Sequence, residues 1–164
     1  TEGATMNNNT GFYYINRKRL MDKLTPEQRS KNMRAIKNKG SQIERLLMKA
    51  LWHKGYRYRK HVKTVYGNPD IVFGKYKIAI FCDSEFWHGK DWNHQKSGVK
   101  SNPDFWNTKI QSNIERDRKV NDVLRGNGWT VLRFWGKDIV RHLDLCVQTI
   151  EIELLRQSRE STCH

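Results

Sequence analysis

The chain has 164 residues, which is enough for one domain with a single hydrophobic core and too few for two sizeable domains. Lys and Arg outnumber Asp and Glu by 31 to 17, and the net charge of +14 favours a polyanionic partner such as nucleic acid, with an incidentally basic surface as the alternative. The sequence has no apolar run of about 18 residues, no signal-peptide core and no Cys-x-x-Cys pair, which argues against a membrane partner and a disulfide framework and favours the cytoplasm.

The first part of the chain is expected to be helical. Residues 1–20 are interpreted as an N-terminal extension, of which the first few are a candidate artificial addition. Thr25-Pro26-Glu27-Gln28 offers an N-cap threonine and a proline at the first helical position, so a helix is expected from there to about Lys37. Ser41-Gln42-Ile43-Glu44 is a capping box that opens a second helix through about Lys54.

Strands are expected next. Residues 56–62 alternate weakly between apolar and polar side chains. The apolar runs Asp70–Phe73 and Lys77–Cys82 are separated by the turn residues Gly74-Lys75, so we expect them to pair as a central hairpin.

The second half of the chain starts with an irregular stretch. Residues 84–104 show no clear period, and so long a loop within a compact domain is usually functional or mobile. The elements expected after it are a helix from about Pro103 to Arg125, a buried strand at 129–135 and a helix from about Lys137 to Leu155. This order predicts a layered α/β or α+β domain. We place that domain at residues 21–157, followed by a polar tail at 158–164.

Acidic residues stand at the ends of the predicted hairpin. Asp70 begins its first strand and Asp83 follows its second, so strand pairing brings both to the same end of the sheet. If the second strand continues, Glu85 lies on the same face as Asp83. Converging carboxylates supply the oxygen ligands that Mg²⁺ prefers, and the ion lowers the pKa of an attacking water. Alternatively, Asp70 caps a turn and the other two are ordinary strand-end charges.

Three more residues are candidates for the same site. Asp117 lies on the apolar stripe of the helix expected at 103–125, where a bare carboxylate is costly, so it is either paired with an arginine or close to a metal. Glu44 is explained by its capping box or by a place near the metal. His88 follows the acidic cluster and is a candidate to orient or deprotonate the water. Four of the other histidines are interpreted as surface residues: His53, His61, His94 and His142.

Two aromatic pairs, Phe86-Trp87 and Phe105-Trp106, flank the irregular stretch. Packing in the core is the default explanation for such pairs. In a DNA-binding protein, aromatic side chains on loops also stack on bases or wedge between them.

Several segments have a distinctive combined pattern: Arg29–Ile36, Ile43-Glu44, Asn68-Pro69-Asp70-Ile71-Val72, Ile80-Phe81 with Asp83, Phe86-Trp87-His88-Gly89, Phe105-Trp106, Lys109-Ile110, Asn113–Arg118 and Gly128–Leu132. In this order, between about Leu24 and Leu155, they resemble the very short patch repair endonucleases, a branch of the restriction-endonuclease-like superfamily. The resemblance implies an α/β fold with a restriction-endonuclease-like core, in which helices flank a central mixed β-sheet. It also implies a monomeric, magnesium-dependent and nucleoid-associated enzyme that nicks one strand of double-stranded DNA beside a T:G mismatch.

The resemblance further implies roles for single residues. Asp70 matches the central metal-binding aspartate, and Cys82 matches a position that offers its backbone carbonyl to the metal. Asp83 matches a position occupied by His or Asp in the family, and His88 matches the histidine that assists the water. The remaining matches are the outer carboxylates Glu44 and Asp117 and the aromatic residues that wedge into DNA, Phe86, Trp87 and Trp106.

One part of the family pattern is missing here. The family commonly carries a structural zinc ion held by Cys and His around the irregular loop, whereas the matching positions in this chain are Glu85, Lys90, Trp92 and Lys137. These residues do not form a zinc-binding set, so we expect no structural zinc and a loop held by packing, for instance of Trp92. Glu85 would then add a carboxylate beside the metal, where it could bind a second cation or act on water.

The sequence is compatible with three functions. The first is a mismatch-specific nicking endonuclease. The second is a restriction-type or mobile-element nuclease that cuts matched duplex DNA. The third is a DNA-binding module without catalysis.

Overall fold

The computed structural model describes residues 25, 27, 41–96 and 102–162. The chain divides into two compact units, residues 1–36 and 37–164, and the elements described below all belong to the second. The N-terminal extension and nearly all of the helix expected at 25–37 lie outside the described residues.

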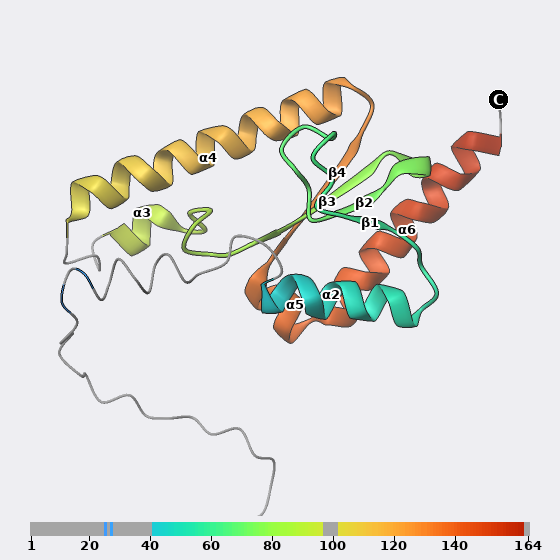
Figure 1. Ribbon diagram of the computed structural model, residues 1–164, viewed down its shortest axis with the longest axis horizontal. Coiled ribbons are helices and arrows are strands. Elements are labelled where there is room, and N and C mark those ends of the chain that lie inside the picture. The colour runs from blue at the N-terminus through green and yellow to red at the C-terminus, as the bar shows by residue number, and fades with distance from the viewer. Residues whose placement is uncertain (1–24, 26, 28–40, 97–101, 163–164) are drawn as a thin grey trace, which may run out of the picture. The chain divides into compact units, whose positions relative to one another are not determined.

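The centre of the second unit is a four-stranded mixed sheet in the order β1-β2-β3-β4. Strands β1, β2 and β3 pair antiparallel, and β4 pairs parallel to β3, which lies in the interior of the sheet (Figure 1). The predicted hairpin is confirmed, with Val72 opposite Ala79 and a short 3₁₀ turn, η1, between its strands. The strands are β1 (Arg59–Lys60), β2 (Ile71–Phe73), β3 (Ile78–Asp83) and β4 (Thr130–Trp135), and η1 covers Gly74–Tyr76.

Helices cover both faces of this sheet, as Figure 1 shows. One face packs against α2 (Gln42–His53), α5 (Gly136–Arg141) and α6 (Leu143–Thr162), and the other against α4 (Pro103–Gly126). The alternation of β3 explains the division, because Ile78 and Ile80 join the first core, whereas Ala79 and Phe81 join the second. The expected α/β architecture, a central mixed sheet flanked by helices, is therefore confirmed.

Three elements of the structure differ in extent from those predicted. The strand expected at 56–62 is reduced to the two residues of β1, and the Tyr58 ring instead packs edge-on against Phe73. The irregular stretch contains a short helix, α3 (Trp92–Gln95). The last helix is split at His142, whose φ of −134° is not helical, and its second part continues to Thr162. This break lets both α5 and α6 turn buried residues, Ile139 and Val147, toward the same core. Among the described residues, no helix is long and apolar enough to cross a membrane.

Candidate active site

The carboxylate of Asp70 lies beside the end of β3, as the hairpin predicted. The backbone N–H of Asp70 donates to the carbonyl of Ile80 (3.0 Å), which continues the ladder by one residue beyond β2. Its Oδ2 accepts a hydrogen bond of 2.8 Å from the backbone N–H of Cys82. The Asp70 side chain is therefore held against the strand that ends in Asp83.

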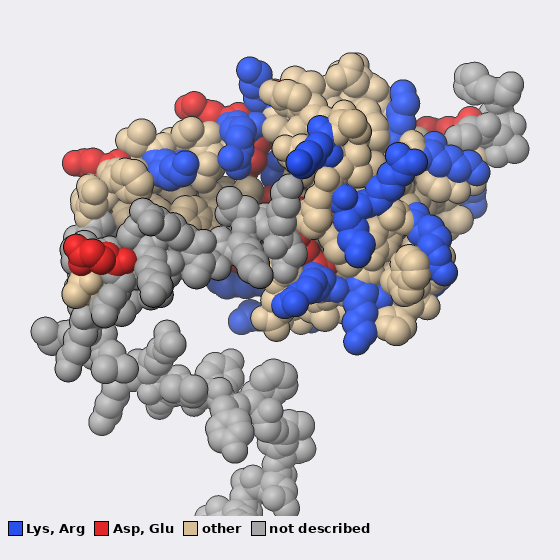
Figure 2. All heavy atoms as spheres, viewed as in Figure 1, with Lys and Arg blue, Asp and Glu red and all other residues tan. Residues whose placement is uncertain are grey.

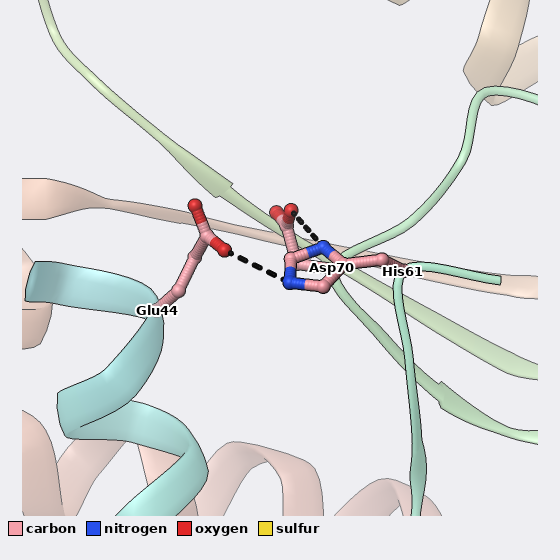
Figure 3. A group of neighbouring side chains, drawn as sticks. All are labelled: Glu44, His61 and Asp70. Atoms are coloured by element: carbon pink, nitrogen blue, oxygen red, sulfur yellow. Dashed lines mark ion pairs between the residues drawn. The ribbon is translucent and has the colours of Figure 1, made fainter. Parts of the chain in front are cut away.

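Asp70 belongs to a group of three side chains that could hold a metal ion, Glu44, His61 and Asp70, drawn in Figure 3. Nε2 of His61 lies 3.5 Å from Oε2 of Glu44, and Nδ1 lies 3.7 Å from Oδ1 of Asp70. One nitrogen or oxygen atom from each residue lies within 4.8 Å of the others. Carboxylate and imidazole donors at this spacing fit a divalent cation.

His61 was missed by the sequence analysis, which interpreted it as a surface residue. The pairing of β1 with β2 places it opposite Asp70, and its backbone N–H donates to the Asp70 carbonyl at 3.1 Å. The weak alternation over 56–62 could not reveal this, because it does not set the register between the two strands. One signal could have revealed the contact. His61 follows the first strand of an antiparallel pair by one residue, and Asp70 precedes the second strand by one residue, so the two can lie opposite each other.

The environment of Asp70 disfavours its charged form. Burial raises its pKa to about 7, and the charges of Glu44 and Asp83 also raise it, against the lowering effects of the Cys82 N–H and of His88. Three carboxylates thus share a partly desolvated region. A bound cation would compensate this repulsion, which is a second reason why the residues fit a metal.

Asp83 lies in a neighbouring polar group on the α4 side of the sheet. Both of its oxygens accept hydrogen bonds from Nη1 of Arg133, at 3.0 and 2.7 Å, and Nδ1 of His88 lies 3.5 Å from its Oδ1. The parallel register explains the arrangement, because Arg133 stands opposite Phe81, two residues before Asp83, so the three side chains share one face. The carboxylate of Asp83 therefore already has a cationic partner beside the Asp70 group.

Arg133 also links the group to α4. Its Nε donates to Asn121 at 2.9 Å, its Nη2 lies 3.5 Å from Asp117, and its guanidinium stands 4.3 Å above the Phe81 ring. Arg133 was not among the residues predicted for the site. A lone arginine in the strand expected to be buried at 129–135 was a usable signal, because a buried charge needs a partner. The expectation of a buried strand was wrong, since every residue of β4 is only half-buried.

Asp117 is paired, which is one of the two alternatives that its place on the apolar stripe of the helix left open. Its Oδ2 lies 2.6 Å from Nδ1 of His88, a short contact between the loop and the middle of α4. Burial alone would raise its pKa, but the His88 hydrogen bond and the charges of Arg133, His88 and Arg116 together lower it. Asp117 is thus an anion that orients the His88 ring.

Glu85 lies apart from both groups. The strand alternation that predicted Asp83 and Glu85 on one face does not reach Glu85, because β3 ends at Asp83. Its Oε1 instead accepts a 2.6 Å hydrogen bond from the backbone N–H of Lys137 at the start of α5. Two of the positions that match zinc ligands in the family therefore contact each other directly.

The rest of the loop is fastened to α4. The buried Trp92 donates from Nε1 to Asn107 (3.0 Å), and the Asn113 side chain donates to the carbonyl of Trp87 (2.9 Å). Gly89 approaches α4 so closely that a Cβ there would lie 2.6 Å from the side chain of Ile114. Packing and hydrogen bonds therefore hold the described part of this loop.

Aromatic side chains from the loop and from the first turns of α4 form one cluster. The rings of Phe86, Trp87 and Trp106 contact one another with centroids 5.4 to 5.6 Å apart, and Phe105 adds a ring that is 54% exposed. The three clustered rings are half-buried. The flanking pairs thus meet in space, and their contact with DNA stays a prediction.

Basic side chains are numerous on the surface of the described part. Figure 2 shows Lys and Arg side chains mainly over the right of the viewed face, with acidic side chains at the left and near the centre. Phosphates are attracted to such a surface, whereas acidic groups within it need a cation before an anionic substrate can approach.

Comparison with known proteins gives matches of considerable extent. The sequence profile of the family described as DNA mismatch endonuclease Vsr matches residues 21–94. The type II nicking enzyme V.HpaIIP of Haemophilus parainfluenzae is 58% identical over 123 residues, which cover 74% of this chain and 87% of that protein. The type II nicking enzyme V.NmeDIP of Neisseria meningitidis serogroup C is 49% identical over 130 residues, or 79% of this chain and 88% of that protein.

A third relative is named for action at mismatches. The DNA mismatch endonuclease Vsr of Escherichia coli K12 is 38% identical over 110 residues, which cover 65% of this chain and 68% of that protein. The range matched by the family profile includes Glu44, Asp70, Asp83 and His88. That range does not include Asp117 and Arg133, which complete the polar group around Asp83 and His88.

Proposed function

Because the chain belongs to the Vsr family of DNA endonucleases, we propose that it is a magnesium-dependent enzyme that nicks one strand of double-stranded DNA beside a T:G mismatch. The observation that carries the proposal is the meeting of two polar groups near the end of β3, one built around Asp70 and the other around His88. The relative from E. coli is named a mismatch endonuclease, and other relatives are named nicking enzymes, which supports single-strand cleavage.

Asp70 is the residue that we propose to hold the magnesium ion, with the backbone carbonyl of Cys82 and the carboxylate of Asp83 as further candidates. When bound, the ion would neutralise charge on the scissile phosphate and make a water molecule easier to deprotonate. Glu44 would contact this site from α2, because its Oε2 faces His61 and its charge acts on Asp70. Burial raises the pKa of the Cys82 thiol strongly, so its side chain stays neutral.

His88 is the proposed acceptor of the proton from the attacking water. A carboxylate accepts hydrogen bonds and cannot donate them when ionised, so the contact with Asp117 places the proton of the neutral ring on Nδ1. Nε2 is then the basic nitrogen. Asp117 would also stabilise the imidazolium that forms when Nε2 takes the proton, while Arg133 holds Asp117 and Asp83 in place.

The aromatic cluster is the proposed wedge at the mismatch. Phe86 and Trp87 come directly before His88 in the chain, and Trp106 contacts both of their rings. Insertion of this cluster into the base stack would place the neighbouring phosphate near the polar groups. Unstacking and unpairing a base cost least where it is mismatched, so opening the helix at a T:G pair costs less than at a matched pair. We expect the protein to act as a monomer on chromosomal DNA in the bacterial cytoplasm.

The test is a nicking assay with strand-labelled duplexes that differ in one base pair, T:G, T:A or C:G, in magnesium or in chelator. We expect one labelled strand of the T:G duplex to be cut, and no cleavage in chelator. Equal cutting of all three duplexes would instead support a restriction-type nuclease, and binding without cleavage under any divalent ion would support a DNA-binding module.

Asp70→Ala is the variant that tests the metal site in the same assay. It should lose at least about a hundredfold of the nicking rate, a barrier increase near 2.7 kcal/mol, while it keeps its affinity for DNA. A variant that retains more of the rate would contradict the assignment of Asp70 to the metal.

A further inference from the structure

His61 stands between two carboxylates without a close hydrogen bond to either. Its nitrogens lie 3.5 Å from Oε2 of Glu44 and 3.7 Å from Oδ1 of Asp70, and N–H···O hydrogen bonds are typically 2.7 to 3.2 Å long. Figure 3 shows the imidazole placed between the two acidic side chains. Its backbone has a φ of +47°, a left-handed conformation that is uncommon for residues other than glycine.

The spacing is close to that of atoms that share one metal ion. With metal–ligand distances of about 2.1 Å in an octahedral site, neighbouring ligands lie about 3 Å apart and opposite ligands about 4.2 Å apart. The distance of 3.7 Å between Nδ1 of His61 and Oδ1 of Asp70 lies between these values. An ion can therefore contact both atoms after small side-chain movements.

The two carboxylates are oriented for this arrangement. Asp70 uses Oδ2 to accept the Cys82 N–H at 2.8 Å and turns Oδ1 toward His61. Glu44 uses Oε1 to accept hydrogen bonds from Ser41 in the capping box and turns Oε2 toward the other side of the imidazole. Each carboxylate is thus anchored through one oxygen and presents the other to the ring.

We propose that His61 is a direct ligand of the divalent ion, through Nδ1 and together with Oδ1 of Asp70, while its Nε2–H is oriented by Glu44. This inference rests on the proposed metal site at Asp70. A metal-bound histidine commonly donates its second ring N–H to a carboxylate, which fixes the ring and makes the bound nitrogen more basic. Glu44 occupies the position that such a partner needs.

A nitrogen ligand changes which ions the site prefers. Mg²⁺ and Ca²⁺ favour oxygen ligands, whereas imidazole nitrogen increases affinity for Mn²⁺ and Co²⁺. The site is therefore expected to bind Mn²⁺ more tightly than Mg²⁺. His61→Gln, which offers an amide oxygen, should weaken Mn²⁺ binding by about tenfold or more and Mg²⁺ binding by a smaller factor.

The direct test is pulsed electron paramagnetic resonance of Mn²⁺ bound to the full chain without DNA. We expect the spectrum of the wild-type protein to contain nitrogen modulation from one imidazole, with the nitrogen isotope confirmed by labelling histidine with ¹⁵N. The modulation should disappear in His61→Gln and persist in His88→Gln, which removes the other histidine near the site. His53→Gln, on the exposed end of α2, is the control for adventitious surface binding.

The outcomes separate this inference from the function on which it rests. Mn²⁺ that binds in an Asp70-dependent way but lacks nitrogen modulation in the wild-type protein would overturn the role of His61 and leave the metal site standing. Modulation lost in His88→Gln and kept in His61→Gln would overturn it as well. If Asp70→Asn does not alter Mn²⁺ binding, the proposed metal site itself fails. If His61→Gln does not fold, the spectra of the wild type and of His88→Gln decide the question, because modulation that is absent from the first or lost in the second overturns the role of His61.

Discussion

Nδ1 of His88 and Oδ2 of Asp117 lie 2.6 Å apart, although 29 residues separate them in the chain. The first residue belongs to the loop after β3 and the second to the middle of α4. This contact selects the tautomer of the imidazole, because the carboxylate accepts a hydrogen bond from Nδ1–H and leaves Nε2 as the basic nitrogen.

Asp117→Asn is therefore expected to slow nicking of the T:G duplex by about a hundredfold, within the range attributed to general-base catalysis. The amide NH₂ can donate to Nδ1 and so favour the tautomer with a protonated Nε2. DNA affinity should change little, because the substitution leaves the shape of the side chain intact. Rates from single-turnover assays and affinities from DNA titrations test this expectation.

The control for that experiment is Asp122→Asn, which changes an exposed carboxylate on the same helix. It should nick DNA at the wild-type rate. If Asp117→Asn were also within about threefold of the wild type, the proposed role of His88 as the base would have to be abandoned.

The stability of the metal-free protein should fall as the pH rises from about 4 to 7. The pKa of Asp70 is about 7 in the folded protein and has its ordinary value of 3.8 in the unfolded chain, so the folded state binds more protons within this window. The resulting loss of unfolding free energy amounts to roughly 4 kcal/mol at most. Asp70→Asn cannot ionise and keeps an acceptor for the Cys82 N–H, so it should be more stable than the wild type at pH 8 and not at pH 4.

Thermal unfolding in chelator at these two pH values measures the effect, and a difference of several degrees in Tm at pH 8 is expected. Asp122→Asn again serves as the comparison and should show no pH-dependent gain. A Tm of Asp70→Asn that lies below the wild type by the same amount at both pH values would contradict the raised pKa.

Arg133→Met should destabilise the fold, because it leaves the buried carboxylate of Asp83 without its cation. Removing one partner of a buried ion pair typically costs several kcal/mol, and roughly 3 kcal/mol is expected here. The double variant Arg133→Met with Asp83→Asn should recover part of this loss, since no charge is then left unpaired. Denaturant unfolding curves of the wild type, Arg133→Met, Asp83→Asn and the double variant give the coupling free energy.

Arg156→Ala provides the comparison for an exposed arginine. Arg156 forms ion pairs with Glu153 and Glu160 on the surface of α6, where solvent screens them, so little change is expected. If the unfolding free energy of Arg133→Met were as high as that of Arg156→Ala, the Asp83–Arg133 pair would add nothing to the stability of the fold.

The loop after β3 should keep its structure without zinc. Glu85 accepts the Lys137 N–H, and Trp92 donates to Asn107, so both ends of the described loop are held by protein contacts. Treatment with a strong zinc chelator should leave Tm and the near-ultraviolet spectrum unchanged, and metal analysis should find less than one tenth of a zinc ion per chain. One zinc per chain, lost together with the loop's tryptophan signals, would show that another set of ligands exists.

Much of the framework was accessible from local patterns. The capping box at Ser41–Glu44 and the hairpin between Asp70 and Asp83 were predicted and confirmed, because caps and turns depend on residues a few positions apart. The pairing of Asp117 followed from its place on an apolar helix stripe. Its partner did not, since a helical pattern shows which face is buried and not what packs against it.

The amino-acid sequence by itself determined the layered α/β order, the basic character, the family and the candidates Asp70, His88 and Asp117. Tertiary structure decided that Arg133 pairs with Asp83 across 50 residues and that His61, rather than Glu85, stands next to Asp70. The physical reason is that these neighbours depend on the register of β1 against β2 and of β3 against β4, and on where β3 ends. Register is set by the packing of the whole sheet, so it becomes known only when the strands are assembled.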